Sequence, residues 1–474
     1  MSTFANAVSN RSARTANGMK ARATSANACV DLFYNIGASR GKDIIPAFVA
    51  AYAENRDLAV RIALWARDVR GGAGERKLFR DILNYVATQD VDLTSRIIKK
   101  VPVVGRFDDL LAITDPIVRG IGHELIRQAL NAGNGLAAKW MPRKGAEAVE
   151  LRSFLGMTPK QYRKTLVNLT KVVETQMCAR DWDNINFSHV PSLASSRYKK
   201  AFARRTAEYG KYVEKLKSGD KSVKVNAAAV YPYDILKGVC TYGMLPYGVA
   251  EQGHIVAQWN ALPDYVGDAA VLPIIDVSGS MGAPVQTGNG KRGTMTCMDV
   301  SISLGLYLAE KNKGKFKDLW MTFSSKPKLY QLRGDILQRV KQMDRSNWEM
   351  STDLHAAMQL ILDTATKGNV PQDEMPKTLL ILSDMQFNSC ARYDDSAIQM
   401  IRRKFGAAGY TMPNVVFWNL NAYDNSPVRH DESGVALVSG FSPAIAKSVL
   451  SSSLENFTPE NIMLQTVMSE RYNF

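Results

Sequence analysis

The spacing of apolar residues changes near residue 269, and this change divides the chain into two kinds of structure. Before it, long segments place apolar residues at i, i+3, i+4 and i+7, the spacing of amphipathic helices. After it, short apolar runs of strand length, beginning with VLPIID at 271–276, alternate with helical stretches. The two patterns belong to different architectures. The sequence therefore predicts a multidomain protein, with an all-α part followed by an α/β part.

The helical pattern covers residues 28–245, and only short Gly or Pro interruptions break it. Helices joined by short turns predict antiparallel pairs stacked as a HEAT-like repeat domain. Residues 1–27 hold four basic residues and no acidic one, which predicts a flexible basic N-terminal arm. The same composition is compatible with an organelle transit peptide, although nothing resembles a cleavage site. Residues 246–268 are interrupted by Gly and Pro and predict a linker.

Strand and helix patterns alternate over residues 269–455, which predicts a doubly wound parallel sheet. Residues 456–474 are left as a C-terminal tail. The predicted strands are 271–276, 318–324, 377–384, 414–420 and 434–440, and the predicted helices are 294–312, 353–366, 394–408 and 442–450.

The net charge of +15 is confined to the first part of the chain. Residues 1–265 hold 39 Lys and Arg against 24 Asp and Glu, whereas residues 266–474 hold 21 of each. The stretch 143–224 alone carries a net +10. Such an asymmetry indicates a polyanionic partner for the first part, most simply nucleic acid, although a solvated helical surface could also carry it.

The five cysteines are far apart, with no CxxC pair and no secretory signal at the N-terminus, so a reduced, cytoplasmic location is expected. The five histidines are equally dispersed, which disfavours structural zinc. No run of about 18 apolar residues is present, and no membrane partner is expected.

A run of oxygen-bearing side chains follows the first predicted strand of the α/β part. Asp276, Ser278 and Ser280 form a D-x-S-x-S turn, and the carboxyl ends of parallel strands are where open sheets bind ligands. Thr352 precedes a predicted helix, and Asp384 ends the strand 377–384, both at the same expected edge. Carboxylate and hydroxyl oxygens suit Mg²⁺, although Mn²⁺ or Ca²⁺ would accept the same ligands.

Each of these residues also has a structural interpretation. Asp276 could cap a helix, the serines could be turn residues, and Thr352 could be a helix N-cap. All three elements together, however, match the metal-ion-dependent adhesion site, and the region 269–450 resembles a von Willebrand factor A domain. The resemblance implies that Ser278, Ser280 and Thr352 bind the cation directly. It also implies that Asp276 and Asp384 often act through water, with one position open for a partner's carboxylate.

Basic and aromatic residues are interleaved in the helical part, a composition that suits single-stranded RNA. The loop 67–76 lacks the phosphate-loop signature, and its preceding helix argues against nucleotide hydrolysis, although Arg70 or Arg76 could contact a phosphate. Aromatic residues such as Tyr162 and Tyr209 could stack bases or fill the core. The candidate nucleic-acid contacts are Arg70, Arg76, Arg106, Lys139, Arg143, Lys144, Arg163, Lys164, Lys199, Lys200, Arg204 and Arg205.

The order of several motifs resembles the TROVE architecture of Ro ribonucleoproteins. These motifs are RDVRGGAGERKLF, VPVVGRFDDLL, AKWMPRK and YRKTLVNLTKVVE, followed by the adhesion-type domain. The chain is still more similar to a plant and bacteriophage family of the same layout, as FWNL and GVALVSGF near the C-terminus indicate. The resemblance implies a HEAT-repeat ring that binds small structured RNA and single-stranded RNA ends.

The leading hypothesis is therefore a non-enzymatic RNA-binding protein of the cytoplasm, or of the host cytoplasm if a phage encodes it. The alternative is a protein-interaction or assembly module, such as a phage structural or accessory protein, whose metal binds an acidic protein ligand. An enzyme is the third hypothesis, because Mg²⁺ can serve phosphoryl chemistry, yet no positioned base stands beside the site. His355 is the only histidine near it in sequence.

Overall fold

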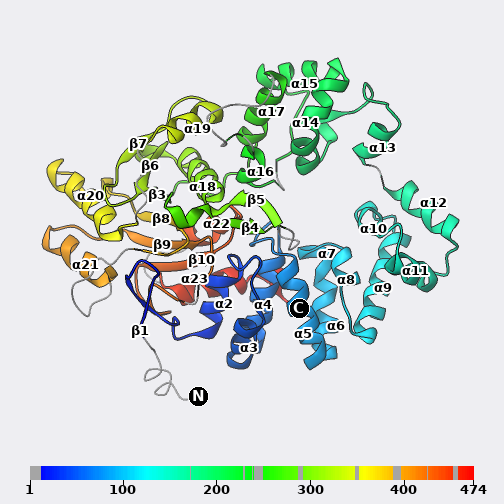
Figure 1. The fold of residues 1–474 in the computed structure, drawn as a ribbon, viewed down its shortest axis with the longest axis horizontal. Coiled ribbons are helices and arrows are strands. Elements are labelled where there is room, and N and C mark those ends of the chain that lie inside the picture. The colour runs from blue at the N-terminus through cyan, green and yellow to red at the C-terminus, as the bar shows by residue number, and fades with distance from the viewer. Residues whose placement is uncertain are drawn as a thin grey trace.

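The two kinds of structure predicted from the sequence are both present in the computed structural model. It describes residues 12–170, 172–227, 230–237, 239, 249–286, 292–346, 352–387, 397–423, 425–451 and 457–474. Over these residues the first half is helical, and the second half contains a mixed sheet with helices (Figure 1). The coarse division into a helical domain and an α/β domain is confirmed.

The helical half is a succession of short helices, many of which begin at a side-chain cap. Asn55, for example, accepts a hydrogen bond from the backbone N–H of Leu58 and starts α4. The helices are α2 (Ala28–Ile36), α3 (Ile45–Glu54), α4 (Arg56–Arg67), α5 (Lys77–Gln89), α6 (Val91–Ile97), α7 (Val101–Val104), α8 (Asp108–Leu111), α9 (Pro116–Asn131), α10 (Gly135–Trp140), α11 (Ala146–Phe154), α12 (Pro159–Leu169), α13 (Val173–Cys178), α14 (Ser192–Arg205), α15 (Ala207–Lys217), α16 (Pro232–Leu236) and α17 (Val249–Asn260).

Neighbouring helices pack on one another along this succession, and together they form an arc. The pairs α2–α3, α3–α4, α4–α5, α5–α6 and α10–α12 are all in contact, as expected of a helical-repeat domain. One end of the arc packs on the sheet through α2 and strand β10 (Val435–Ser439), and the other end returns through α16 to helix α18 (Cys297–Lys311). Figure 1 shows α11 and α12 at the part of the arc that lies farthest from the sheet.

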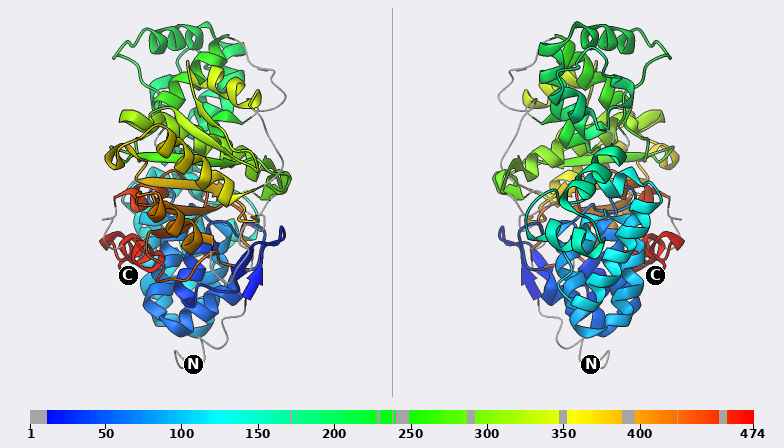
Figure 2. Two further views of the ribbon diagram at one scale, coloured as in Figure 1. Left: turned by 90° about the vertical axis from the view of Figure 1, so that its left-hand side faces the viewer. Right: turned by 90° about the vertical axis from the view of Figure 1, so that its right-hand side faces the viewer.

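The segment of the arc from α13 to α15 has a small core of its own. Val173, Phe187, Phe202, Tyr209 and Val213 fill it, and it is separate from the large core that joins the other helices to the sheet. In the side views of Figure 2, α13 to α15 lie at the opposite end of the molecule from α2 to α6. Helices α13 to α15 therefore form a body of their own, which follows α12 in the chain and packs on α16 and α17.

The α/β domain is built on a six-stranded sheet of order β10-β9-β8-β3-β6-β7. All neighbouring strands are parallel except β7, which runs antiparallel to β6 at one edge. The strands are β3 (Val271–Asp276), β6 (Leu319–Phe323), β7 (Leu329–Gln331), β8 (Thr378–Ser383), β9 (Asn414–Asn419) and β10, and the helices are α18, α19 (Ile336–Asp344), α20 (Leu354–Lys367), α21 (Ala397–Ala407), α22 (Ile445–Leu450) and α23 (Pro459–Val467).

The five strands predicted from the sequence are the five parallel strands. They are wholly or almost wholly buried runs, as expected where helices cover a parallel sheet. Helix α18 packs against β3, β6 and β8. Strand β7 was not predicted, because its three residues are exposed or half-buried and carry no apolar run. The sheet is consequently mixed rather than purely parallel.

Within the predicted N-terminal arm, the described residues 12–27 contain regular secondary structure and contact the α/β domain. Strands β1 (Ser12–Arg14) and β2 (Lys20–Arg22) form an antiparallel hairpin. Arg22 makes a β-bridge with Ser426, and the Thr15 hydroxyl donates a hydrogen bond of 2.5 Å to the carbonyl oxygen of Phe387. The arm is held because its polar groups find partners in the α/β domain.

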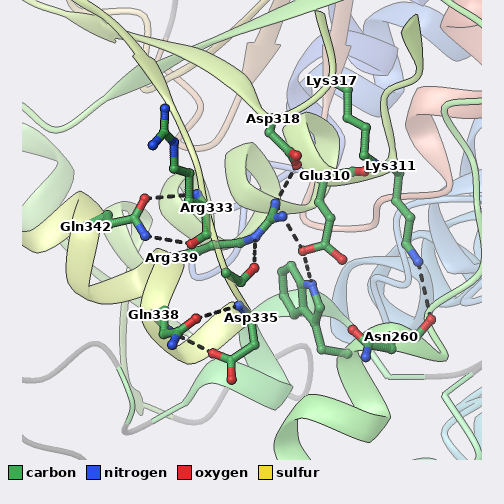
Figure 3. Close-up of polar contacts among 12 residues, drawn as sticks. Asn260, Glu310, Lys311, Lys317, Asp318, Arg333, Asp335, Gln338, Arg339 and Gln342 are labelled. Atoms are coloured by element: carbon green, nitrogen blue, oxygen red, sulfur yellow. Dashed lines mark hydrogen bonds and ion pairs between the residues drawn. The ribbon is translucent and has the colours of Figure 1, made fainter. Parts of the chain in front are cut away.

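The predicted linker 246–268 contains a helix rather than an open connection. Helix α17 buries Ile255 and Trp259 completely or nearly so. The indole N–H of Trp259 donates to Glu310 at 2.8 Å, and Lys311 donates to the carbonyl oxygen of Asn260 (Figure 3). The glycine and proline residues led the sequence analysis to miss a helix that tertiary packing stabilises.

The C-terminal tail is also part of the fold. Helix α23 packs against β10, α2 and α4. Beyond it, the guanidinium of Arg471 pairs with Asp68, and the hydroxyl of Tyr472 donates to the same carboxylate at 3.2 Å. The tail therefore joins the sheet to the helical half instead of extending into solvent. None of the helices within the described residues is long and apolar enough to cross a membrane.

Candidate functional sites

The structure brings the five predicted metal-site residues to one edge of the sheet. Asp276 ends β3, and Asp384 directly follows β8, which is paired with β3 in parallel register. Ser278 and Ser280 lie in the turn after β3, and their hydroxyl oxygens are 3.1 Å apart. Thr352 donates a hydrogen bond of 2.8 Å to the carbonyl oxygen of Gln386 in the loop after β8.

The Asp276 carboxylate has hydrogen-bond partners within the fold. Its Oδ1 accepts from the backbone N–H of Ser278 at 2.9 Å, and its Oδ2 accepts from the hydroxyl of Ser383. Burial, together with the nearby charge of Asp384, raises the pKa of Asp276 to about 7. Ser383 was missed by the sequence analysis. Its position beside Asp384, at the end of the strand, could have revealed it.

Asp384 is different, because one of its oxygens lacks a partner. Its Oδ1 accepts from the backbone N–H of Gln386 at 3.3 Å, whereas Oδ2 is buried with no hydrogen bond from the described protein atoms. Burial raises the pKa of this carboxyl, and the Ser280 hydroxyl opposes the shift. A buried carboxylate oxygen without a partner is costly, and a cation can supply the missing interaction.

The backbone around this carboxylate is held in an unusual conformation. Met385 has a φ of 63°, which is unfavourable for a residue with a side chain, and its own side chain is buried. Thr352 is fully buried and is not the N-cap of α20, because Asp353 accepts from the N–H of Ala356 in that role. The structural interpretation of Thr352 as a cap is therefore wrong.

The donors at this edge fit an oxygen-liganded cation better than zinc. They are two carboxylates and three hydroxyls, a set suited to Mg²⁺. Across the described residues, no three His, Cys, Asp or Glu side chains converge as a metal cluster. His355 contacts Lys404 of α21, and burial lowers its pKa.

The predicted nucleic-acid contacts lie on three groups of elements of the helical half. Arg70, Arg76 and Arg106 lie around α4 to α8, close to the sheet-facing end of the arc. Lys139, Arg143, Lys144, Arg163 and Lys164 lie on or between α10 and α12, and Lys199, Lys200, Arg204 and Arg205 lie on α14.

The Gly-rich loop after α4 uses its own backbone within the fold. The N–H groups of Gly72, Ala73 and Glu75 donate to carbonyl oxygens of Asp68, Trp65 and Ala66. A Cβ atom on Gly72 would lie 1.8 Å from the carbonyl oxygen of Trp65, so the close packing requires glycine. These three N–H groups already have partners within the fold and are not available to a phosphate.

Most cations of this region are bound to carboxylates. Asp109 is fully buried and accepts from Arg67 at 2.8 Å and from Arg80 at 2.7 Å. Arg106 pairs with Asp108, and its guanidinium carbon lies 3.3 Å from the centroid of the Trp140 ring. Burial and the neighbouring arginines lower the pKa of Arg76 to about 10. These residues hold helices together.

The interleaved aromatic residues pack inside the protein. Tyr162, Phe202, Tyr209 and Tyr212 are buried, and Trp182 and Tyr198 are half-buried against the small core. Phe202 and Tyr209 have ring centroids 5.6 Å apart. The four buried rings therefore cannot stack bases in this conformation, and the core interpretation is correct for them.

Two grooves on the far part of the arc are lined by basic residues. One, of about 430 Å³, lies beside α14 and includes Arg197, Lys199, Lys200, Lys237 and Asp234. Burial, reinforced by Lys200, lowers the pKa of Lys199 to about 8. The other, of about 610 Å³, lies between α11 and α12 and includes Arg143, Lys144 and Arg163.

The sequence analysis missed two further basic residues of the groove between α11 and α12, Arg152 and Lys160. Lys160 precedes Arg163 by three residues, the spacing of one helix face, and that spacing could have revealed it.

The fold and these sites define a two-part protein, in which a basic helical arc is joined to an α/β domain with an oxygen-rich sheet edge. Residues 114–272 match the model of a domain of unknown function (DUF2828), and residues 270–471 match that of a second (DUF7788). "Uncharacterized protein L728" of Acanthamoeba polyphaga mimivirus is 30% identical over 518 aligned positions, covering 96% of this chain and 86% of the viral protein. The chain belongs to the same family as this mimivirus protein.

A solved structure, that of the Ro (RSR) protein of Deinococcus radiodurans, is similar at a lower level. It shares 15% sequence identity and a TM-score of 0.37, over 92% of this chain and 93% of that chain.

Proposed function

We propose that this protein is a non-enzymatic RNA-binding protein that uses the basic far part of its helical arc. The observation that carries the proposal is the segregation of charge. The stretch 143–224 has a net +10 and forms α11 to α15, away from the electroneutral α/β domain. A concentrated positive field of this kind attracts nucleic acid. The motif order that resembles Ro ribonucleoproteins supports RNA rather than DNA as the partner.

Retention of RNA on a filter tests this function. We expect the intact protein to bind a single-stranded RNA of about 20 nucleotides at 50 mM salt, and to lose affinity steeply by 200 mM. Each neutralised phosphate of a single strand contributes about −0.7 to the slope of log affinity against log salt. Absence of binding at 50 mM salt would rule the function out.

We also propose that the sheet edge binds a divalent cation, most simply Mg²⁺, as the resemblance to a von Willebrand factor A domain implies. Asp276, Ser278, Ser280, Thr352 and Asp384 would hold it. The unpartnered Oδ2 of Asp384 supports this proposal. A bound cation would supply positive charge for the two carboxylates and an attachment point for an acidic ligand.

Thermal unfolding with and without Mg²⁺ tests the cation site. Mg²⁺ at 100 times its dissociation constant should stabilise the wild type by about 2.7 kcal/mol. Asp384→Asn should remove this response. Without Mg²⁺ the variant should be at least as stable as the wild type, because it no longer buries an unpaired charge. An equal response of both proteins to Mg²⁺ would contradict the site.

The second candidate function is a protein-interaction or assembly module, which the same carboxylate oxygen favours. In that case the cation would bind a carboxylate of a partner protein. An Asp276→Ala change should then abolish capture of that partner and leave RNA retention intact. Capture by the variant at the wild-type level would argue against the module.

A further inference from the structure

The groove between α11 and α12 concentrates positive charge more than any other feature described above. Its lining includes five cationic residues, Arg143, Lys144, Arg152, Lys160 and Arg163, and no acidic residue. Four of the five are exposed, and Arg152 is half-buried. Within the described part of the chain, no carboxylate pairs with any of the five side chains.

The acidic residues of α11 do not neutralise this groove. Glu150 pairs with Arg119 of α9 and approaches His123 of the same helix. Glu147 is exposed and is not part of the groove lining. The helix therefore pairs Glu150 with α9, while Arg152 lines the groove on the side of α12.

The fold holds the groove open before any ligand binds. Tyr162 is buried, and its hydroxyl donates a hydrogen bond of 3.0 Å to the carbonyl oxygen of Pro142, which fixes the segment that carries Arg143 and Lys144. Thr158 and Gln161 form a capping box at the start of α12. The apolar floor includes Ala148 and Leu166, both buried. A preformed site loses little entropy when it binds.

The shape and chemistry of the groove fit a chain of phosphates. A solvated basic helix surface would spread its cations over a convex face, whereas a concave lining of one sign focuses the electrostatic potential. The single aromatic residue of the lining, Tyr162, is buried and hydrogen-bonded, so it cannot stack a base. The groove can therefore contact phosphates but has no platform for bases.

We propose that the groove between α11 and α12 binds the phosphate backbone of a single RNA strand, without preference for base sequence. This inference rests on the proposed RNA-binding function and assigns its principal site. Arg143, Arg152 and Arg163 would form charge-assisted hydrogen bonds with phosphate oxygens, and Lys144 and Lys160 would add charge.

The test compares two double variants of the full-length protein that change net charge equally. Lys160→Gln with Arg163→Gln removes two cations of the groove. Lys313→Gln with Lys315→Gln removes two cations of the electroneutral α/β domain that pair with Asp268 and Glu374. Fluorescence anisotropy measures binding of a labelled 20-nucleotide uridine strand at several salt concentrations, and circular dichroism checks that both variants are folded.

The groove variant should bind about 25-fold more weakly at 0.1 M salt, because each lost phosphate contact costs about fivefold there. Its slope of log affinity against log salt should become shallower by about 1.4. The control variant should stay within about threefold of the wild type, since paired surface cations contribute little. Lys160→Arg with Arg163→Lys keeps both charges and should retain most of the affinity.

Equal losses in the groove variant and the control would overturn the assignment of the site while leaving the RNA-binding function intact. Failure of the wild type to bind the uridine strand at 50 mM salt would overturn both. A 20-residue polyglutamate that displaces the strand as well as unlabelled uridine RNA does would instead identify the groove as a site for acidic peptides. A sequence-independent affinity for other single strands of equal length is the expected result.

Discussion

The cations around α4 to α8 and those of α11 and α12 belong to the same helical half but have opposite surroundings. Near the sheet, Arg67 and Arg80 both bind the buried carboxylate of Asp109. In the groove between α11 and α12, Arg152 and Arg163 have no carboxylate partner among the described residues. The difference teaches that a count of basic residues does not locate a binding surface. Paired cations stabilise the fold, and unpaired ones remain available for a ligand.

The largest expected effect concerns the paired region. Asp109→Ala should lower the free energy of unfolding by about 3–5 kcal/mol, because it leaves Arg67 buried without its partner. Urea unfolding followed by circular dichroism measures the loss, and the affinity for single-stranded RNA at 5 °C should change little in the remaining folded protein. A loss below about 1 kcal/mol would show that the pairing is not structural.

A second effect concerns a histidine that is buried where α14, α15 and α17 pack together. His254 is fully buried beside Ser195, and burial, together with Lys199, lowers its pKa to about 3. The unfolded chain takes up a proton below about pH 6.5 while the folded state does not, so stability is lost as the pH falls from about 6.5 towards 3.

At pH 5 this residue alone should lower the free energy of unfolding by about 2 kcal/mol relative to pH 7. Urea unfolding of the wild type and of His254→Asn at both pH values measures the contribution. The variant is expected to be less stable at pH 7 but less sensitive to pH. If both proteins lose the same stability on acidification, His254 is not the responsible group.

Arg106 tests the comparison of paired and unpaired cations at a single residue. Its guanidinium pairs with Asp108 and stacks on Trp140. Arg106→Gln should therefore cost about 1 kcal/mol of unfolding free energy and should change the affinity for RNA by less than about twofold. A large loss of RNA affinity with unchanged stability would place this arginine on the binding surface instead.

Arg143 should behave in the opposite way and gives the smallest effect on stability. It is exposed in the groove, so Arg143→Gln should change the free energy of unfolding by no more than about 0.5 kcal/mol. Its affinity for RNA at 0.1 M salt should fall about fivefold. Thermal unfolding and anisotropy of the same preparation decide whether stability and binding separate in this way.

The division of the fold and the positions of its long elements could be predicted from local patterns. Apolar runs such as 378–383 are buried along their whole length. A short, continuous apolar run is typical of a strand in a parallel sheet that helices cover on both faces. The D-x-S-x-S turn could be placed for the same reason, since it follows such a run at Asp276. What was missed depends on distant partners. Helix α17 is stabilised by Glu310, and the N-terminal hairpin by the loop at Phe387.

The candidate RNA surface was harder to predict than the sheet edge, because the pairing of charges is a tertiary property. Arg106 and Arg163 are equivalent in a list of basic residues, yet only Arg106 has a carboxylate two residues away that its side chain reaches. The aromatic residues are ambiguous for the same reason. Tyr162 lies among cations in sequence, but its ring is buried in the core and its hydroxyl donates a hydrogen bond to the carbonyl oxygen of Pro142.

The most direct test of RNA binding is to identify the nucleic acid that accompanies the intact protein through purification at low salt. The ratio of absorbance at 260 and 280 nm and a gel of the extracted material, treated with ribonuclease or deoxyribonuclease, suffice. We predict nucleic acid that ribonuclease degrades, that deoxyribonuclease leaves intact, and that washing with high salt removes. Protein free of nucleic acid that also fails to take up added RNA, or material degraded by deoxyribonuclease alone, would contradict the account.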